Sequence, residues 1–201
     1  MLTLMNPALN VVRRNEAIAC DIVYSDVPAI DDGSTAAVIF VGMDTQVTNV
    51  YGIKTDKQFV NTLEEVIIAR GAPHKLISDS ATVIISNKIQ DILRTLCIKS
   101  WQSEPHQQQQ NPAERRYQTI KRAANRVLDR SGAPDYTWLL CLQYVCYLLN
   151  HAYNENHAGV PLTLIAGSDI SPLLRFHFWQ KVYFINVDST FPSNSVEVVG
   201  N

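Results

Sequence analysis

The chain has 201 residues, of which 46% are hydrophobic and 18% are charged, a mixture typical of one globular domain with a sizeable core. Its formal net charge of −2 excludes a basic surface spread over the whole molecule, so any affinity for nucleic acid must come from local charge. The four cysteines show no CxxC pair, which predicts reduced, buried thiols in an intracellular, non-secreted protein.

The amino-terminal third is predicted to be an arm followed by three strands. Residues 1–16 show no clear period and are predicted to be an N-terminal arm or linker, without the apolar core of a signal peptide. Residues 17–24 form an apolar run interrupted by Asp21, as expected for a buried strand with one functional carboxylate. Two further strands are predicted at 35–41 and 47–53, and the short connections between the three indicate an antiparallel meander.

The rest of the chain alternates between helical and extended patterns. Helices are predicted at residues 55–70, 87–96, 113–130 and 134–151, strands at 74–78 and 97–101, and a polar loop at 102–110. This order predicts an α/β fold, a mixed five-stranded sheet flanked by helices on both faces, as in RNase H-like domains.

The predicted helix at 134–151 is apolar almost all round, with Trp138 and Tyr144 among its large side chains. It is too short, and too interrupted by Asp135 and Gln143, for a membrane span of about twenty apolar residues. The pattern therefore predicts burial in a core or at a subunit contact, and no membrane association.

Two carboxylates mark the candidate site. Asp79 follows the end of a predicted strand, and Glu114 stands just after Pro112, in the first turn of a predicted helix. Taken alone, Asp79 would be interpreted as a turn or N-cap residue and Glu114 as an acid favoured by the helix dipole. Together they are a candidate set for a hard divalent cation, which prefers oxygen ligands.

The spacing of these residues resembles a known family. Thirty-four residues separate Asp79 from Glu114, and Gln107–Gln110 with Asn111 precede the second carboxylate, similar to the catalytic cores of retroviral and LTR-retrotransposon integrases. The segment 159–184 resembles the part that follows the core in copia-type elements, although Phe176–His177–Phe178 replaces the usual phenylalanine–glycine pair. The zinc module that precedes many integrase cores is missing from the sequence.

The resemblance implies three units: an arm at 1–16, a catalytic core at 17–155 and a copia-type extension at 156–201. It also implies Asp21, Asp79 and Glu114 as catalytic ligands of Mg²⁺ or Mn²⁺, a homo-oligomer, and DNA partners, both element ends and target. The nucleus is the implied compartment. The first ligand has an alternative, because Asp26 lies five residues after Asp21, and the two face opposite ways along a regular strand. Asp21 is favoured because it lies within the strand.

The predicted helix at 113–130 carries six basic and two acidic residues, a local charge of +4. Gln118 and Lys121 share the edge of Glu114, and the resemblance implies that Lys121 contacts the DNA end; the alternative is an ordinary surface lysine. The DNA-binding candidates Arg115, Arg122 and Arg126 lie, with Arg130, on the opposite exposed side, where a solvated face is an equal interpretation.

The predicted function is therefore integrase-like polynucleotidyl transfer: metal-dependent processing of DNA 3′ ends and strand transfer for retrotransposon integration. The alternative is a domesticated or decayed fragment that binds DNA or a protein without catalysis. An RNase H-type nuclease is a second enzymatic alternative, which would lack the Pro112–Glu114 helix start and the copia-like tail.

Overall fold

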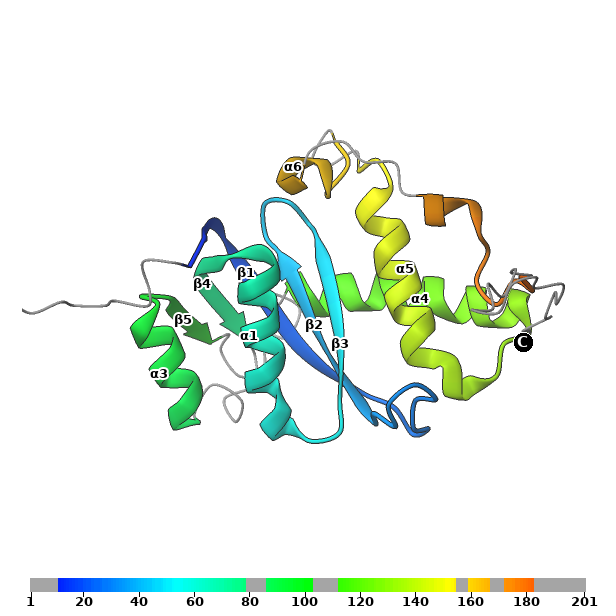
Figure 1. The fold of residues 1–201 in the computed structure, drawn as a ribbon, viewed down its shortest axis with the longest axis horizontal. Coiled ribbons are helices and arrows are strands. Elements are labelled where there is room, and N and C mark those ends of the chain that lie inside the picture. The colour runs from blue at the N-terminus through cyan, green and yellow to red at the C-terminus, as the bar shows by residue number, and fades with distance from the viewer. Residues whose placement is uncertain (1–10, 79–85, 103–111, 155–158, 167–171, 183–201) are drawn as a thin grey trace, which may run out of the picture.

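A computed structural model describes residues 11–78, 86–102, 112–154, 159–166 and 172–182. It contains a five-stranded sheet in the order β3-β2-β1-β4-β5, which confirms the predicted mixed sheet (Figure 1). The strands are β1 (Arg13–Tyr24), β2 (Ala36–Gly42), β3 (Thr48–Ile53), β4 (Ala72–Ser78) and β5 (Lys99–Gln102). The helices are α1 (Phe59–Arg70), α3 (Asn87–Thr95), α4 (Pro112–Ser131), α5 (Trp138–His151) and the short α6 (Thr163–Ala166). Single 3₁₀ turns cover Asp56–Gln58, Asp135–Thr137 and Pro172–Arg175.

Strand β1 is the centre of the sheet and pairs in two directions. It runs antiparallel to β2, with Asp21 opposite Ile39, and parallel to β4, with Cys20 opposite Ser78. Strands β2 and β3 form an antiparallel hairpin, so the predicted three-stranded meander is confirmed. The parallel pairs bring the carboxyl ends of β1 and β4 to the same edge of the sheet.

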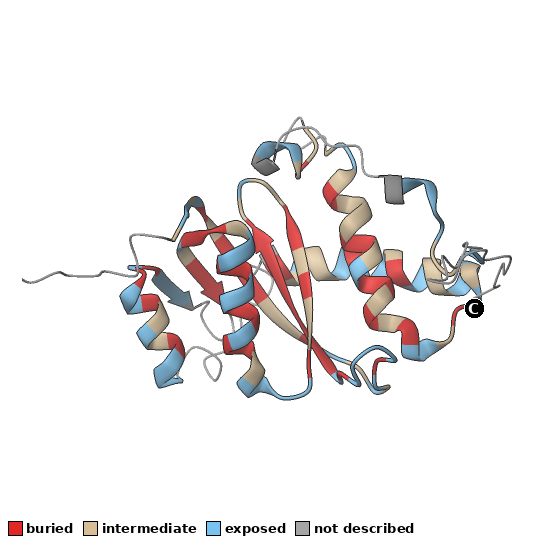
Figure 2. Ribbon diagram, in the orientation of Figure 1, coloured by how far each residue is buried: buried red, intermediate tan, exposed pale blue. Residues whose placement is uncertain are grey.

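Alternate residues of β1 face two different helical layers, because successive side chains of a strand point to opposite faces. Ile18 and Cys20 pack into a core with α1 and α3, whereas Ala19 and Val23 pack into a second core with α4 and α5. The sheet is therefore covered on both faces, and Figure 2 shows the buried residues concentrated along the central strands. Asp21 lies between Ala19 and Val23 in the sequence and so belongs to the face toward α4.

Strand β1 begins at Arg13, four residues earlier than predicted and inside the segment interpreted as an arm. The early start is stabilised by buried polar contacts that the sequence pattern does not show. Arg14 forms an ion pair with Glu16, whose carboxylate also accepts the backbone N–H of Thr45 at 3.0 Å. Burial lowers the pKa of Arg14 to about 10, and the positive charge of Arg70 adds to the effect. A Cβ at Gly42 would lie 2.6 Å from Glu16 Oε1, so glycine leaves room for this cluster.

The predicted helix 134–151 is a 3₁₀ turn followed by α5. Leu139, Leu142 and Val145 are buried, whereas Trp138 and Tyr144 remain half-buried. The described part of the tail covers some of this helix: the Tyr144 hydroxyl donates to the Phe176 carbonyl at 3.1 Å. The Tyr144 and Phe178 rings are 5.4 Å apart. No helix among the described residues is long and apolar enough to cross a membrane.

Candidate active site between the sheet edge and helix α4

Asp21 is positioned by β1 on the side of the sheet that faces α4. Asp21 is half-buried, and the Ile22 N–H donates to Asp21 Oδ1 at 2.8 Å. Its neighbour Cys20 pairs with Ser78, the last residue of β4. Asp79, the second predicted ligand, follows Ser78 in the sequence but lies outside the described residues, as do the loop residues Gln107–Asn111.

Glu114 stands in the first turn of α4 as predicted, next to Ala113, whose side chain is fully buried against the sheet. Its Oε2 atom is buried and has no hydrogen-bond partner among the described residues. A buried acceptor without a partner is unusual, because folding normally satisfies such atoms. An orphaned carboxylate oxygen in a helix's first turn is therefore available for an external ligand.

Tyr117 connects the two elements. It lies one turn after Glu114 on the face of α4 that packs against the sheet. Burial raises the pKa of Tyr117, and the nearby negative charge of Asp21 raises it further. Tyr117 packs against the core that includes Ala19 and Val23, which flank Asp21 on the same face of β1, so this face of α4 lies against the strand that carries Asp21.

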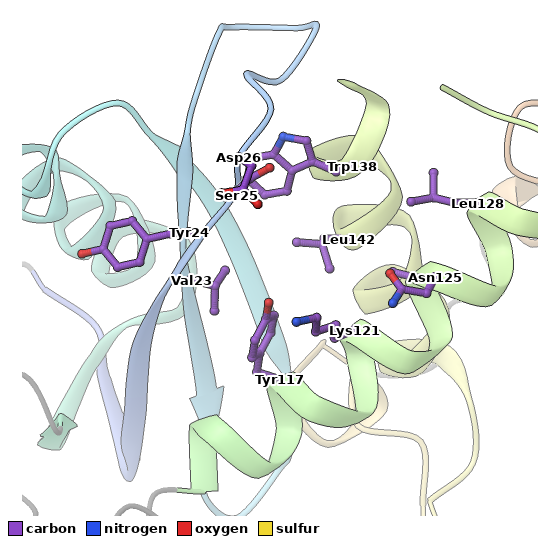
Figure 3. A pocket seen from close by; sticks show the side chains of 11 residues that line it. Val23, Tyr24, Ser25, Asp26, Tyr117, Lys121, Asn125, Leu128, Trp138 and Leu142 are labelled. Carbon is purple, nitrogen blue, oxygen red and sulfur yellow. The ribbon is translucent and has the colours of Figure 1, made fainter. Parts of the chain in front are cut away.

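Asp26 lies elsewhere, in the turn that follows β1. It lines a cavity of about 240 Å³ together with Tyr117, Lys121, Asn125 and Trp138 (Figure 3). The two candidates for the first ligand are thus separated: Asp21 is on the sheet, and Asp26 is at the rim of the neighbouring cavity.

The polar side chains that the sequence analysis assigned to DNA are all exposed on α4. Gln118 and Lys121 are exposed, and Lys121 Nζ lies 5.9 Å from the centroid of the Tyr117 ring. The arginines predicted to lie away from the apolar face are also exposed: Arg115, Arg122, Arg126 and Arg130. The Arg122 Nε donates to the Gln118 carbonyl at 3.1 Å.

Arg116 is a residue whose role the sequence analysis missed. Its side chain is half-buried and its Nε donates to Thr48 Oγ1 at 3.2 Å, which joins α4 to the β2–β3 hairpin. Burial lowers its pKa. The signal was available, because Arg116 falls at helical spacing between buried Ala113 and Ile120.

Within the described ranges, no group of three or more His, Cys, Asp and Glu side chains is arranged to hold a metal ion. Two of the candidate ligands are described, Asp21 on β1 and Glu114 on α4, and both would supply oxygen. Such donors suit Mg²⁺ or Mn²⁺ rather than a thiolate- or imidazole-binding metal.

Neither a protein-family model nor a curated protein matches the sequence. Solved structures do match the fold. The trimeric form of the HTLV-2 integrase catalytic core with magnesium has a TM-score of 0.59 at 14% identity, and covers 78% of this chain and 99% of that one. The BIV integrase catalytic core has a TM-score of 0.57 at 15% identity, over 76% of this chain and 94% of that one.

A third match is to a longer chain, in the intasome of simian T-cell lymphotropic virus in complex with the PP2A regulatory subunit B56 gamma. Its TM-score is 0.62 at 16% identity, and the match covers 80% of this chain but 58% of that one. The chain therefore has a mixed α/β, RNase H-like fold. In particular, it is the fold that retroviral integrase catalytic cores have, as the predicted fold class required.

Proposed function

We propose that this chain is the core of an integrase-like polynucleotidyl transferase of copia type, which processes DNA 3′ ends and joins them to target DNA. The observation that carries the proposal is the Glu114 oxygen that is buried without a partner among the described residues. It lies in the first turn of α4, the helix that packs against the face of β1 to which Asp21 belongs. The integrase-core fold and the Asp79–Glu114 spacing support the same conclusion.

The donor set fits a divalent cation, Mg²⁺ or Mn²⁺. Asp21 and Glu114 would hold it, with Asp79 as the proposed third ligand, and the unpaired Glu114 Oε2 is the acceptor that such a cation would satisfy. When bound, divalent cations activate the attacking oxygen and stabilise the leaving oxygen in phosphoryl transfer.

The chain's own residues position the DNA and the carboxylates. Lys121 and Gln118 are exposed on the edge of α4 that also carries Glu114, where they can hold phosphates of the DNA end. Tyr117 lies on the face of α4 that packs against β1, the strand of Asp21. In end processing, the oxygen of water attacks the phosphorus and the bond from phosphorus to the 3′ oxygen breaks. The element strand keeps a 3′-hydroxyl, and the released nucleotides carry the 5′-phosphate. In strand transfer, that hydroxyl attacks a target phosphodiester, so one such bond forms as another breaks.

Three further assignments belong to this proposal. The chain would be divided into an arm at 1–16, whose last residues join β1, a core at 17–155 and an extension at 156–201. It would act as a homo-oligomer on element ends and target DNA, in the nucleus. The competing proposal is a decayed or domesticated fragment that binds DNA or a protein without catalysis.

The test is a strand-transfer assay on oligonucleotides with Mg²⁺ or Mn²⁺. The wild-type chain should form products, whereas Asp79→Asn, Asp21→Asn and Glu114→Gln should lose them while keeping DNA affinity. Asp129→Asn, an exposed change on the same helix, is the matched control and should remain active. If the wild-type chain binds DNA but gives no product with either metal, the non-catalytic alternative replaces the proposal. If Asp26→Asn abolishes product and Asp21→Asn does not, the first ligand is Asp26.

A further inference from the structure

The cavity between β1 and α4 has two polar walls and an apolar floor. Asp26 lies on the wall that follows β1, and Lys121 and Asn125 lie on the α4 wall (Figure 3). The floor is formed by apolar side chains, Val23, Leu128 and Leu142. The volume of about 240 Å³ is below the range of drug-sized ligand sites, so the cavity suits one small ring system.

An aromatic wall of the cavity is held in place. The Trp138 Nε1–H donates to the Val27 carbonyl at 2.8 Å, which fixes the indole against the loop after β1. Tyr24 borders the cavity, but its ring points away from it (Figure 3). Its hydroxyl donates to Asp56 Oδ1 at 3.3 Å. A fixed indole beside apolar side chains offers a planar ring a surface on which to pack.

The polar groups at the rim have no hydrogen-bonding partners within the described part of the chain. Asp26, Lys121 and Asn125 make neither a hydrogen bond nor an ion pair with other described residues, and all three are exposed. By contrast, the Ser25 hydroxyl is occupied, because it donates to the Val27 carbonyl at 3.0 Å. The described walls of the cavity therefore present an anion, a cation and an amide that can bind a ligand.

This combination favours a neutral polar ring over a phosphate. A phosphate inside the cavity would gain from the Lys121 ammonium but would be repelled by the Asp26 carboxylate on the opposite wall, so Lys121 is left to hold a backbone phosphate outside the cavity. A nucleobase carries no charge, offers donors and acceptors on its edge, and has flat faces for packing. An exocyclic amino group, as on adenine or cytosine, can donate to the Asp26 carboxylate.

The cavity also lies close to the proposed reaction site. Val23 is two residues after Asp21 on the same face of β1, and Tyr117, three residues after Glu114 on α4, also lines the cavity. Along α4, Lys121 is seven residues beyond Glu114, about 10 Å at 1.5 Å per residue. That distance corresponds to about three base steps of B-DNA.

We infer that the cavity receives one unpaired base of the DNA strand engaged at Glu114, with a preference for a base that carries an exocyclic amino group. This inference rests on the proposed function. It assigns Trp138 and the apolar floor to base packing, Asp26 to reading of the amino group, and Asn125 to a second polar contact.

The first experiment needs neither metal nor DNA. Adenosine, cytidine and thymidine are titrated into the protein, and the Trp138 indole N–H signal is followed by NMR, assigned with Trp138→Phe. Adenosine and cytidine should shift the signal at concentrations about fivefold or more below thymidine. Asp26→Asn should remove that preference, because an amide can both donate and accept. Asp31→Asn, an exposed change in the same loop, should keep it. Absence of any nucleoside-dependent shift overturns the inference.

The second experiment identifies the source of the base. Duplexes with one abasic position at each of the last few sites of the reactive strand are bound by anisotropy without metal. One position should lose about tenfold in affinity, as expected for loss of a stacked base. Asn125→Phe, which places a ring at the exposed mouth of the cavity, should remove that dependence. If no abasic position changes the DNA affinity while nucleosides still bind, the cavity takes free nucleosides. That result overturns the inference that it receives a base of the DNA strand.

The failures can be told apart. Strand transfer without nucleoside binding or a sensitive abasic position rejects the cavity inference and leaves the proposed function standing. Nucleoside binding with a sensitive position, but no strand transfer by the wild-type chain, rejects the catalytic function and keeps the base-binding cavity.

Discussion

Glu114 keeps a buried carboxylate oxygen without a partner among the described residues, an arrangement that costs folding free energy. An unsatisfied buried acceptor is destabilising by about 1–3 kcal/mol. Such costs are tolerated where function needs the group, which agrees with the proposed role of Glu114 as a metal ligand.

Replacing Glu114 by Leu should therefore raise stability by about 1 kcal/mol, because the unpaired oxygen is removed and leucine suits a helix. Chemical denaturation of the metal-free protein measures the change. Gln118→Leu, at an exposed position one turn away, is the matched control and should shift the free energy of unfolding by less than about 0.5 kcal/mol. A decrease in stability in Glu114→Leu would show that the carboxylate is satisfied in the folded protein.

The buried thiols of α5 predict an alkaline limit to stability. Burial raises the pKa of Cys141 and of Cys146 to about 12, well above the ordinary range of a thiol. The folded state therefore retains these protons where the unfolded chain releases them. The contribution to stability is complete below about pH 8.5, the ordinary pKa of a thiol, and is lost as pH rises toward 12. Burial raises the pKa of Tyr51 and Tyr117 too, which adds to the decline at high pH.

The denaturation midpoint should thus fall steadily above about pH 9. The variant Cys141→Ala with Cys146→Ala should show a smaller fall, while Cys97→Ser, an exposed cysteine, should match the wild type. Iodoacetamide at about pH 8 gives an independent check, since it should label Cys97 and spare both α5 thiols until the chain unfolds. Rapid labelling of Cys146 in the folded protein would contradict its burial.

Helix α4 separates two sets of basic residues by direction. Lys121 shares the edge of Glu114 and borders the cavity, whereas Arg122 and Arg126 are exposed away from the apolar face. If the proposed function holds, the DNA strand at Glu114 reaches Lys121 first. The two arginines are left for target DNA, a second duplex or a neighbouring subunit.

Lys121→Glu should suppress both end processing and strand transfer, because both reactions use the same DNA end. Arg122→Glu with Arg126→Glu should reduce strand transfer more than end processing. Each substitution that removes a bond to a phosphate should also reduce the logarithmic salt dependence of DNA binding by about one unit. The assignment of the two edges is wrong if the arginine variant abolishes end processing while Lys121→Glu leaves both reactions intact.

Helix α5 is incompletely covered by the described part of the chain. Its inner residues pack on the sheet, and Phe178 from the tail covers Tyr144, but Leu140, Tyr147 and Leu148 stay half-buried. The predicted homo-oligomer would bury this remaining apolar surface.

Light scattering should show self-association that Leu140→Glu weakens by about tenfold or more, since a charge would be buried at the contact. Ile68→Glu, at a side chain that is 84% exposed on α1, is the control and should associate as the wild type does. A wild-type chain that stays monomeric at high concentration would remove α5 as an oligomer contact.

Local patterns along the chain were enough to predict the layout of the fold. Three short apolar runs joined by short connections predicted the meander, and the helix–strand order that followed predicted the mixed sheet. The spacing of Pro112 and Glu114 placed the carboxylate in the first turn of α4, as observed. Strand alternation also indicated that Asp21 and Asp26 could not serve together. These are local or periodic properties, so they can be read directly from the order of the residues.

The meeting of particular polar atoms was set by packing in three dimensions. The start of β1 at Arg13 depends on the hydrogen bonds between Glu16 and Thr45 of the hairpin. The half-buried position of Arg116 depends on its hydrogen bond to Thr48, a residue far away in sequence. The burial of the unpaired Glu114 oxygen is likewise a property of the packed structure, and the cavity at Asp26 forms where β1, α4 and α5 meet. Hydrogen-bond satisfaction and cavity shape depend on atoms from several segments at once, and no periodicity along the chain encodes them.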